Sequence, residues 1–338
     1  MRRWGRIRII ALGALVAAGP ARAQSTHLLV ITGLGGGPEY SQRFREWGAG
    51  LVRAGEAAGL PPGDIVWLAE RPDLDAAVNG PARKERVGAE LAALARRVGP
   101  GDLVMIVLFG HGSERDGQAR LNLPGPDLTG AELATMLEPL HAARTVVVNA
   151  ASASGGFVAP LSAKGRVVIT ATRTGRESEA TRFGGHFVEA FTGGGADTDK
   201  DGRVSMLEAW EYARRAVARE YQEAGRLATE HALIDDNGDG QGSLEPGGPD
   251  GALAARIALG PRTGPGATPT ADSPDAAADP ELRTLLAEKE RLETALAELR
   301  TREESMGAEE YREALERLLL DIARNGQAIR TRQGGDGG

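Results

Sequence analysis

Short apolar runs recur along the chain, and they are continuous rather than alternating with polar residues. Five of them are rich in β-formers: His27–Thr32, Ile65–Leu68, Leu103–Phe109, Thr145–Asn149 and Val167–Thr172. Continuous runs of this length are typical of strands buried on both faces of a parallel sheet. A sixth short run, Ala252–Leu259, is expected to form an edge strand.

The segments between these runs carry apolar residues at helical spacing. They are Ser41–Ala58, Arg83–Val98 and Thr129–Leu140. Alternation of strands and helices predicts a parallel sheet joined by right-handed crossovers. Residues 24–259 are therefore expected to form one α/β domain of three layers, with a mainly parallel six-stranded sheet.

The last part of the chain has a different pattern. Residues 260–279 are rich in Pro, Gly, Ala and Thr, which favours a linker. Residues 280–332 then carry two leucine- and isoleucine-rich stripes, separated near Gly307: Leu282, Leu285, Leu286, Leu292, Leu296 and Leu299, then Leu315, Leu318, Leu319, Ile322 and Ile329. This pattern predicts an antiparallel helical hairpin that could self-associate through its remaining apolar face, or else a single long helix.

Residues 1–23 resemble an export signal. Met1–Arg8 is basic, Ile9–Ala18 is apolar, and Ala21-Arg22-Ala23 offers small residues at a cleavage site. The apolar run is too short to span a bilayer, although an uncleaved anchor is the alternative. We expect a mature chain that begins near Gln24, lies in the periplasm or is secreted, and has no stable membrane anchor.

Composition narrows the classes of function. The net charge is −7, and the basic first segment makes the remainder more acidic still, which argues against a nucleic-acid partner. The chain contains no cysteine, so disulfides, thiolate metal sites and a cysteine nucleophile are all excluded.

Two loops after neighbouring predicted strands carry candidate chemistry. His111 stands between two glycines directly after Leu103–Phe109, and Ser152 lies in a small-residue loop after Thr145–Asn149. Sites in parallel sheets form beyond the carboxyl ends of the strands, where an exposed imidazole suits a general base. Backbone N–H groups of the second loop could form an oxyanion hole, or its serines could only cap the next helix.

This order of motifs resembles the caspase-like and legumain-like cysteine peptidases, and most closely the legumain branch. In that group the His follows the third strand and a Cys nucleophile follows the fourth. The separation of His111 and Ser152 along the chain is typical of that branch. The segment Arg176-Glu177-Ser178-Glu179 is similar to the family's stretch beside the P1 pocket, and the resemblance covers roughly 26–259.

Three positions depart from the family pattern. Ser152 stands at the place of the Cys, Ala150 at that of a pocket acid, and Gly35 at that of the Asn that orients the His. A hydroxyl is a far weaker nucleophile than a thiol and needs strong activation. The resemblance therefore implies one of two functions. The chain is either a pseudopeptidase that binds a peptide or protein in the cleft where active family members bind substrate, or a serine-dependent hydrolase using Ser152 and His111. A scaffold acting through the C-terminal helices is the third reading.

A twelve-residue segment, 197–208, has the complete pattern of a calcium loop. Carboxylates occupy positions one, three and five, glycine occupies position six and glutamate position twelve. The expected Ca²⁺ ligands are Asp197, Asp199, Asp201, the carbonyl of Arg203, Ser205 and Glu208, with a helix following from Met206 to Arg219. An Asp-rich turn without metal is the alternative.

A second, incomplete loop begins at Asp235. Acidic and amide side chains follow in the same spacing, but position twelve is Pro246, which has no ligand atom to close the loop. Residues 235–246 therefore form either a weaker calcium site or an Asn-Gly turn.

Overall fold

The computed structural model describes residues 25–99, 101–140, 144–200, 202–245, 250–260, 279–301 and 306–332. The expected export signal, nearly all of the expected linker and the expected ligand Asp201 lie outside these ranges. None of the helices within the described ranges has the length and apolar character needed to cross a bilayer.

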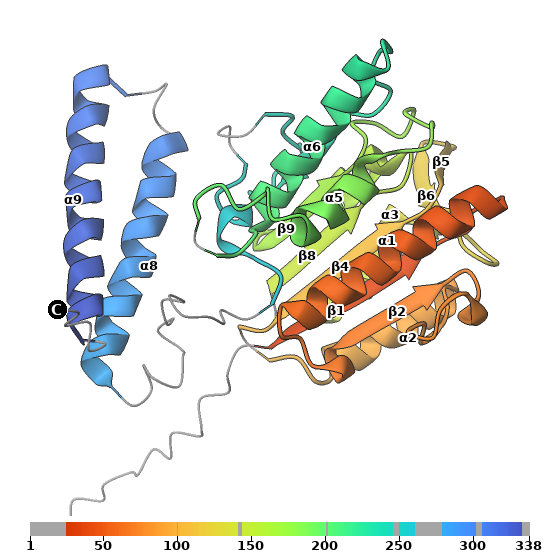
Figure 1. Cartoon of the computed structure of the whole chain (residues 1–338), viewed down its shortest axis with the longest axis horizontal. Coiled ribbons are helices and arrows are strands. Elements are labelled where there is room, and N and C mark those ends of the chain that lie inside the picture. Colours follow the sequence, from red (N-terminus) through yellow and green to blue (C-terminus); the bar gives the residue numbers. More distant parts are fainter. Residues whose placement is uncertain are drawn as a thin grey trace, which may run out of the picture.

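The strands and helices of the α/β domain run from Thr26 to Asp235, and most strands of the central sheet are joined by helices (Figure 1). The strands are β1 (Thr26–Thr32), β2 (Ile65–Ala69), β3 (Gly80–Pro81), β4 (Leu103–Phe109), β5 (Gly112–Arg115), β6 (Gln118–Leu121), β7 (Leu128–Thr129), β8 (Arg144–Asn149), β9 (Arg166–Thr170) and β10 (Leu233–Asp235). The helices are α1 (Pro38–Ala57), α2 (Lys84–Ala95), α3 (Gly130–Leu137), α4 (Val158–Leu161), α5 (Phe183–Thr192), α6 (Met206–Glu223), α8 (Pro280–Thr301) and α9 (Ala308–Arg332).

The central sheet has seven strands in the order β10-β9-β8-β4-β1-β2-β3, and only β10 runs antiparallel to its neighbour. Its strands are covered on both faces, as their continuous apolar sequence predicts. In β1, Leu28 and Val30 face the core under α1, α5 and α6, whereas Leu29 and Ile31 face the core under α2 and α3. The three-layer α/β fold is therefore confirmed.

The predicted edge strand at Ala252–Leu259 is wrong. That segment holds a 3-10 turn, Ala254–Arg256, and its one β-type pairing is an isolated bridge between Ala258 and Ser205. The carboxylate of Asp236 accepts the amides of Leu253 and Ala254, which a sheet ladder would otherwise use. The edges are instead two very short strands, β3 and β10, so the sheet has seven strands rather than six.

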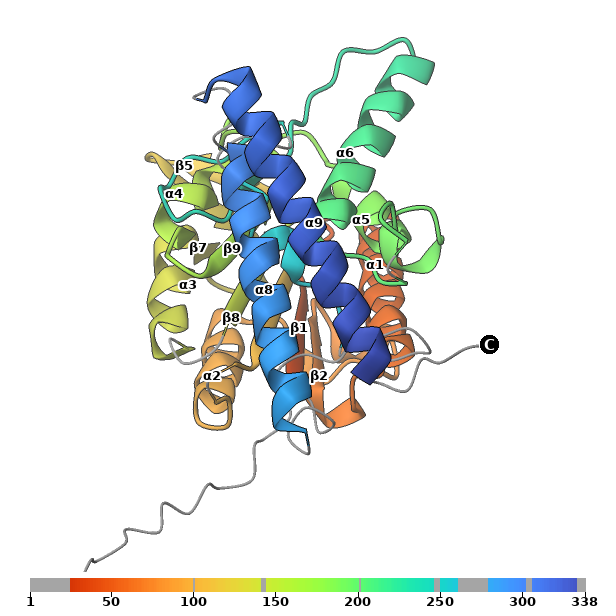
Figure 2. The ribbon, with the colours of Figure 1, turned by 90° about the vertical axis from the view of Figure 1, so that its left-hand side faces the viewer.

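The C-terminal segment forms two helices, α8 and α9, and not one long helix. They lie side by side and antiparallel in both views (Figures 1 and 2). Leu282 and Leu286 near the start of α8 pack against Ile329 near the end of α9, and Arg332 pairs with Asp279 at 2.6 Å. Leu319 departs from the expected stripe, since 47% of its side chain is exposed.

Candidate functional site

His111 lies where the sequence predicts, at the carboxyl end of β4. Its ring packs edge-on against Tyr40, 4.5 Å between ring centroids, and against Phe44 at 5.2 Å. Burial lowers the pKa of His111 below its ordinary value of 6.5, although a hydrogen bond with the backbone of Gly35 acts to raise it. The imidazole is therefore neutral at pH 7, as a general base has to be.

Gly35, expected on sequence grounds in place of an orienting Asn, contacts His111 through its backbone. Its amide donates to Glu70 Oε2 at 2.8 Å, and the hydroxyl of Ser41 donates to the same oxygen at 3.1 Å. A Cβ on Gly35 would lie 2.3 Å from Ser41 Oγ, so this loop needs glycine. His111 is thus held by the main chain, and the main chain is held by Glu70.

Glu70 and Tyr40 are absent from the site expected on sequence grounds. Glu70 follows directly on β2, at the same sheet edge as His111, and an acid leaving a buried strand is the signal that could have identified it. Tyr40 lies in the first turn of α1, and nothing in its local sequence indicates contact with a residue so much later in the chain.

Ser152 is turned into the backbone. Its Oγ accepts from the amide of Gly112 at 2.9 Å and donates to the carbonyl of the same residue at 3.2 Å. Only 2% of Ser152 is exposed. Within the described part of the chain no hydrogen bond joins Ser152 and His111, so the structure brings their two loops to one sheet edge without forming a Ser–His dyad.

The expected oxyanion hole is also occupied by internal contacts. The amide of Ala153 donates to the carbonyl of Glu177 at 2.8 Å, and that of Gly155 donates to Thr172 Oγ1 at 2.9 Å. The amide of Gly112 points at Ser152 Oγ. These N–H groups stabilise the loop and are not presented to a developing negative charge.

The Arg176–Glu179 segment is fixed to a distant part of the chain by Glu177. One carboxylate oxygen lies 2.8 Å from His231 Nδ1, and the other accepts the amides of Arg173 and His231 at 2.8 and 3.1 Å. Glu177 therefore anchors the loop after β9, and the adjoining residues Glu179 and Thr181 line a hollow.

That hollow has a volume of about 640 Å³ and lies between α1, α5, α6 and the loop after β9. Tyr40, which packs on His111, is part of its wall. The charged lining carries both signs: Arg43, Arg182 and Arg226 with Glu46, Glu179, Glu189 and Glu220. His186 bridges Glu189 and Glu220 at 2.9 and 3.1 Å, and its hydrogen bond lowers the pKa of Glu189.

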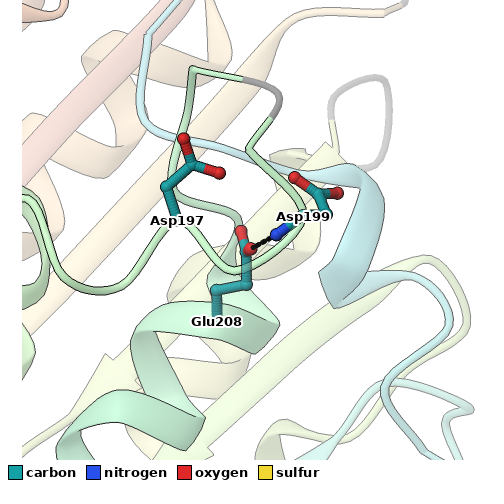
Figure 3. Close-up of side chains that lie close together, drawn as sticks. All are labelled: Asp197, Asp199 and Glu208. Carbon is teal, nitrogen blue, oxygen red and sulfur yellow. Dashed lines mark hydrogen bonds between the residues drawn. The ribbon is translucent and has the colours of Figure 1, made fainter.

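The calcium-type loop lies between α5 and α6. Asp197, Asp199 and Glu208 bring one carboxylate oxygen each within 4.8 Å of the others, and of the described residues this is the one group of three acids so arranged (Figure 3). Helix α5 ends at Thr192, shortly before the loop, whereas α6 begins at Met206 as expected.

Glu208 closes the loop through both oxygens. Oε1 accepts from the amide and hydroxyl of Thr198 and the amide of Asp199, while Oε2 accepts from the amide and hydroxyl of Ser205. Burial would raise the pKa of Glu208, but these hydrogen bonds outweigh it and lower the pKa. Ser205 caps α6, and Glu208 completes the capping box.

The residues fit a hard cation. One carboxylate oxygen of Asp197 accepts from the amide of Gly202 at 3.0 Å, and the other is buried without a partner. Lys200 and Gly202, at positions four and six, have φ of +58° and +84°, which turn the loop back on itself. The guanidinium of Arg203 donates to the carbonyl of Gly260 at 2.8 Å. An all-oxygen set with an unsatisfied buried oxygen suits Ca²⁺.

Comparison with known proteins agrees with the motifs. Residues 83–227, which contain both His111 and Ser152, match the model of the Peptidase C13 family. None of the curated proteins matches the chain.

Two solved structures are similar at low identity. One is a structural-genomics protein from Geobacter sulfurreducens, 11% identical with a TM-score of 0.46 over 70% of this chain and 98% of that one. The other is caspase-1 from Spodoptera frugiperda, 10% identical with a TM-score of 0.43 over 70% of this chain and 94% of that one. The match over residues 83–227 and the order of the His111 and Ser152 loops within it make this part of the α/β domain similar to the Peptidase C13, or legumain-like, family.

Proposed function

We propose that this protein is a pseudopeptidase: an exported, calcium-stabilised legumain-like domain that binds a peptide or protein and does not cleave it. One observation carries the proposal, namely that both hydrogen-bonding functions of the Ser152 hydroxyl are used by the backbone of Gly112. A serine nucleophile needs its proton directed at a base, and here the proton is directed at a carbonyl oxygen.

A fluorophosphonate probe tests this directly. The purified protein and its Ser152→Ala variant should show the same background labelling, because a buried, backbone-bonded hydroxyl does not attack phosphorus. Probe labelling that depends on both Ser152 and His111, accompanied by peptide hydrolysis, would instead establish a serine hydrolase. Trypsin treated in parallel serves as the positive control for the probe.

The mixed-charge hollow supports the binding role. A concave site of about 640 Å³ with three arginines and four glutamates suits a short peptide that carries both charges. Peptides selected from a random display library should lose affinity for an Arg43→Ala/Arg226→Ala variant. A matched Arg96→Ala variant, on the opposite side of the sheet after α2, should bind them unchanged. Equal peptide binding by the wild type and both variants would show that the hollow is not the peptide-binding site.

Export is supported by the basic, apolar and small-residue pattern of residues 1–23. Expressed with this segment in a bacterial host, the protein should appear in the periplasm or medium with Gln24 as its first residue. Retention of Met1 in a membrane fraction would support the uncleaved anchor.

Self-association through the C-terminal helices is a second proposed role, and exposed leucines on α9 support it. Leu319 and Leu320 on α9 are 47% and 49% exposed, and Leu315 lies beside them in a shallow groove. Exposed leucines next to one another favour a further helix as partner. Light scattering after gel filtration should show a larger species that a Leu319→Glu/Leu320→Glu variant reduces to a monomer. An unchanged mass would remove this reading.

A further inference from the structure

The incomplete loop that begins at Asp235 has a positive φ at the same two positions as the complete loop at Asp197. Positions four and six of the complete loop are Lys200 and Gly202, with φ of +58° and +84°. The corresponding residues of the second loop are Gly238 and Gly240, with φ of +83° and +79°. Both loops therefore turn at the same two positions.

The first residue of each loop also has one carboxylate oxygen that is buried without a hydrogen-bond partner. Asp235 is 1% exposed, and its Oδ1 accepts from the amide of Gly238 inside the loop at 3.1 Å. Its Oδ2 is buried and has no hydrogen-bond partner. One carboxylate oxygen of Asp197, in the first loop, is likewise buried without a partner. A buried carboxylate oxygen without a donor costs free energy unless a cation or water satisfies it.

The missing ligand at position twelve is replaced from farther along the chain. Asp250 Oδ1 accepts from the amides of Asp236 and Asn237, at positions two and three, and its Oδ2 accepts from the hydroxyl of Ser243, at position nine. Glu208 makes the same contacts in the first loop, with the amides of positions two and three and the hydroxyl of position nine.

We propose that the loop from Asp235 is a second calcium site, closed by Asp250 instead of by position twelve. The side chains of Asp235, Asn237 and Asp239, the carbonyl of Gln241 and the carboxylate of Asp250 supply its oxygen ligands. The proposal is independent of the first loop, because no residue is shared.

The second site binds more weakly than the first. Its side chains include three carboxylates and one amide, whereas the first loop has four carboxylates, and affinity follows the ligand charge. Its acids must also draw closer around the ion, since of the described residues only those of the first loop already lie within 4.8 Å of one another. Extracellular calcium modules work in the range of about 10⁻⁴ to 10⁻³ M.

Both sites would fix the same segment at the end of the α/β domain. Asp250 begins it, Asp236 binds the amides of Gly251 and Leu253, and farther on the carbonyl of Ile257 accepts from Met206 just after the first loop. Calcium at the second site therefore holds the start of this segment, while the first site holds its end.

Amide signals resolve the two sites in one experiment. The protein, labelled with [¹⁵N]glycine and freed of metal, is titrated with CaCl₂ to 10 mM, with MgCl₂ as a parallel titration. The Gly202 signal should move first, and the Gly238 and Gly240 signals should move at a calcium concentration at least tenfold higher. Signals of Gly238 and Gly240 that stay in place up to 10 mM CaCl₂ would overturn the second site.

Single-loop variants separate the two sites. Asp239→Ala and Asp250→Asn should each raise the midpoint for Gly238 and Gly240 at least tenfold and leave the Gly202 titration unchanged. Asp199→Ala should raise the midpoint for Gly202 and leave the Gly238 and Gly240 titrations unchanged. Calcium binding at the second loop can therefore be measured even if the first loop does not bind calcium. Glu245→Gln, which removes a charge from the same segment outside the ligand set, should leave both titrations as in the wild type. If Glu245→Gln weakens calcium binding as much as Asp239→Ala does, the loss of affinity comes from the loss of negative charge and not from the loss of a ligand, and the proposal is wrong.

Discussion

Ser152 and Gly112 share a pair of hydrogen bonds, in which the serine hydroxyl accepts from the amide and donates to the carbonyl of the same glycine. Gly112 follows His111 directly, so this pair ties the loop after β8 to the loop after β4. A Cβ on Gly112 would lie 2.2 Å from the carbonyl oxygen of Ser152, which shows how closely the two backbones approach. The hydroxyl of Ser152 thus has a structural role.

Ser152→Ala is therefore expected to destabilise the domain. It leaves a buried N–H and a buried C=O of Gly112 without their partner, at a cost of about 1–3 kcal/mol. Urea unfolding should show a lower midpoint with an unchanged slope. Thr135→Ala on the exposed side of α3 is the control and should change stability little. A neutral or stabilising Ser152→Ala would indicate a residue kept for chemistry.

The sequence predicts the sheet well because its strands are buried on both faces and their apolar runs have few interruptions. The short edge strands of the sheet could not be predicted in this way. Strands β3 and β10 are too short to give a periodic signal, and the apolar Ala252–Leu259 run is kept out of the sheet by a carboxylate from outside it, that of Asp236. Local pattern carries no information about such a contact.

For the candidate site too, the sequence identifies some residues but not the contacts that those residues make. His111 and Ser152 are identified by the order of motifs, and the calcium loop by the spacing of its acids. The contacts that decide what those residues do come from elsewhere: Gly35 and Tyr40 on His111, Gly112 on Ser152, and Asp250 on the second loop. Each joins residues that only the tertiary fold brings together.

Gly35→Asn, which supplies the residue expected from the family resemblance, should not create an oriented base. Any Cβ at Gly35 lies within 2.4 Å of the amide nitrogen of Ser41, so the loop must shift and release Glu70 or His111. We expect a loss of about 1–3 kcal/mol, the usual range for overpacking. Gly37→Asn is the matched control, since nothing lies within 4 Å of its Cβ. A stable Gly35→Asn protein that labels with a serine probe would contradict this reading.

Calcium should raise the melting temperature of the α/β domain. A ligand that binds only the folded state, at 100 times its dissociation constant, stabilises by about 2.7 kcal/mol, or several degrees in a domain of this size. Asp199→Ala, which removes one of the three acids in Figure 3, should abolish most of the shift seen at low calcium and still melt cooperatively in EDTA. Asp73→Ala, an exposed acid outside both loops, should respond as the wild type does. Equal melting temperatures in EDTA and in millimolar calcium would exclude the first site.

Acidification should weaken the fold through two histidines, His27 and His111. Burial is the main cause that lowers the pKa of His27 and of His111 below 6.5. A lowered pKa means that the unfolded chain binds the proton better, so this stability is present above pH 6.5 and is lost as the pH falls through the folded-state pKa values. The melting temperature should decline below about pH 6.5, and a His27→Gln/His111→Gln variant should show a flatter decline.

The comparison between variant and wild type isolates this effect. Burial raises the pKa of Glu230 and Asp250, and these carboxyl groups act in the opposite direction as the pH falls. They are the same in both proteins and cancel in the difference. Parallel pH profiles of the two proteins would show that neither histidine contributes.

Ser152→Cys places a thiol at the position expected for a nucleophile and measures how much catalytic geometry the loops after β4 and β8 have. A thiol is partly ionised at neutral pH and forms weaker hydrogen bonds than a hydroxyl, so it is held less firmly by Gly112 and needs less help from a base. We expect slow but measurable labelling by iodoacetamide, because only 2% of residue 152 is exposed, and labelling should fall further in the His111→Ala double variant. Ser154→Cys is the matched control, since Ser154 is equally buried but its hydroxyl faces Thr172 instead of Gly112. Equal labelling at the two positions, unaffected by His111, would mean that the loops after β4 and β8 retain no catalytic relationship, and the binding and scaffold roles would then stand alone.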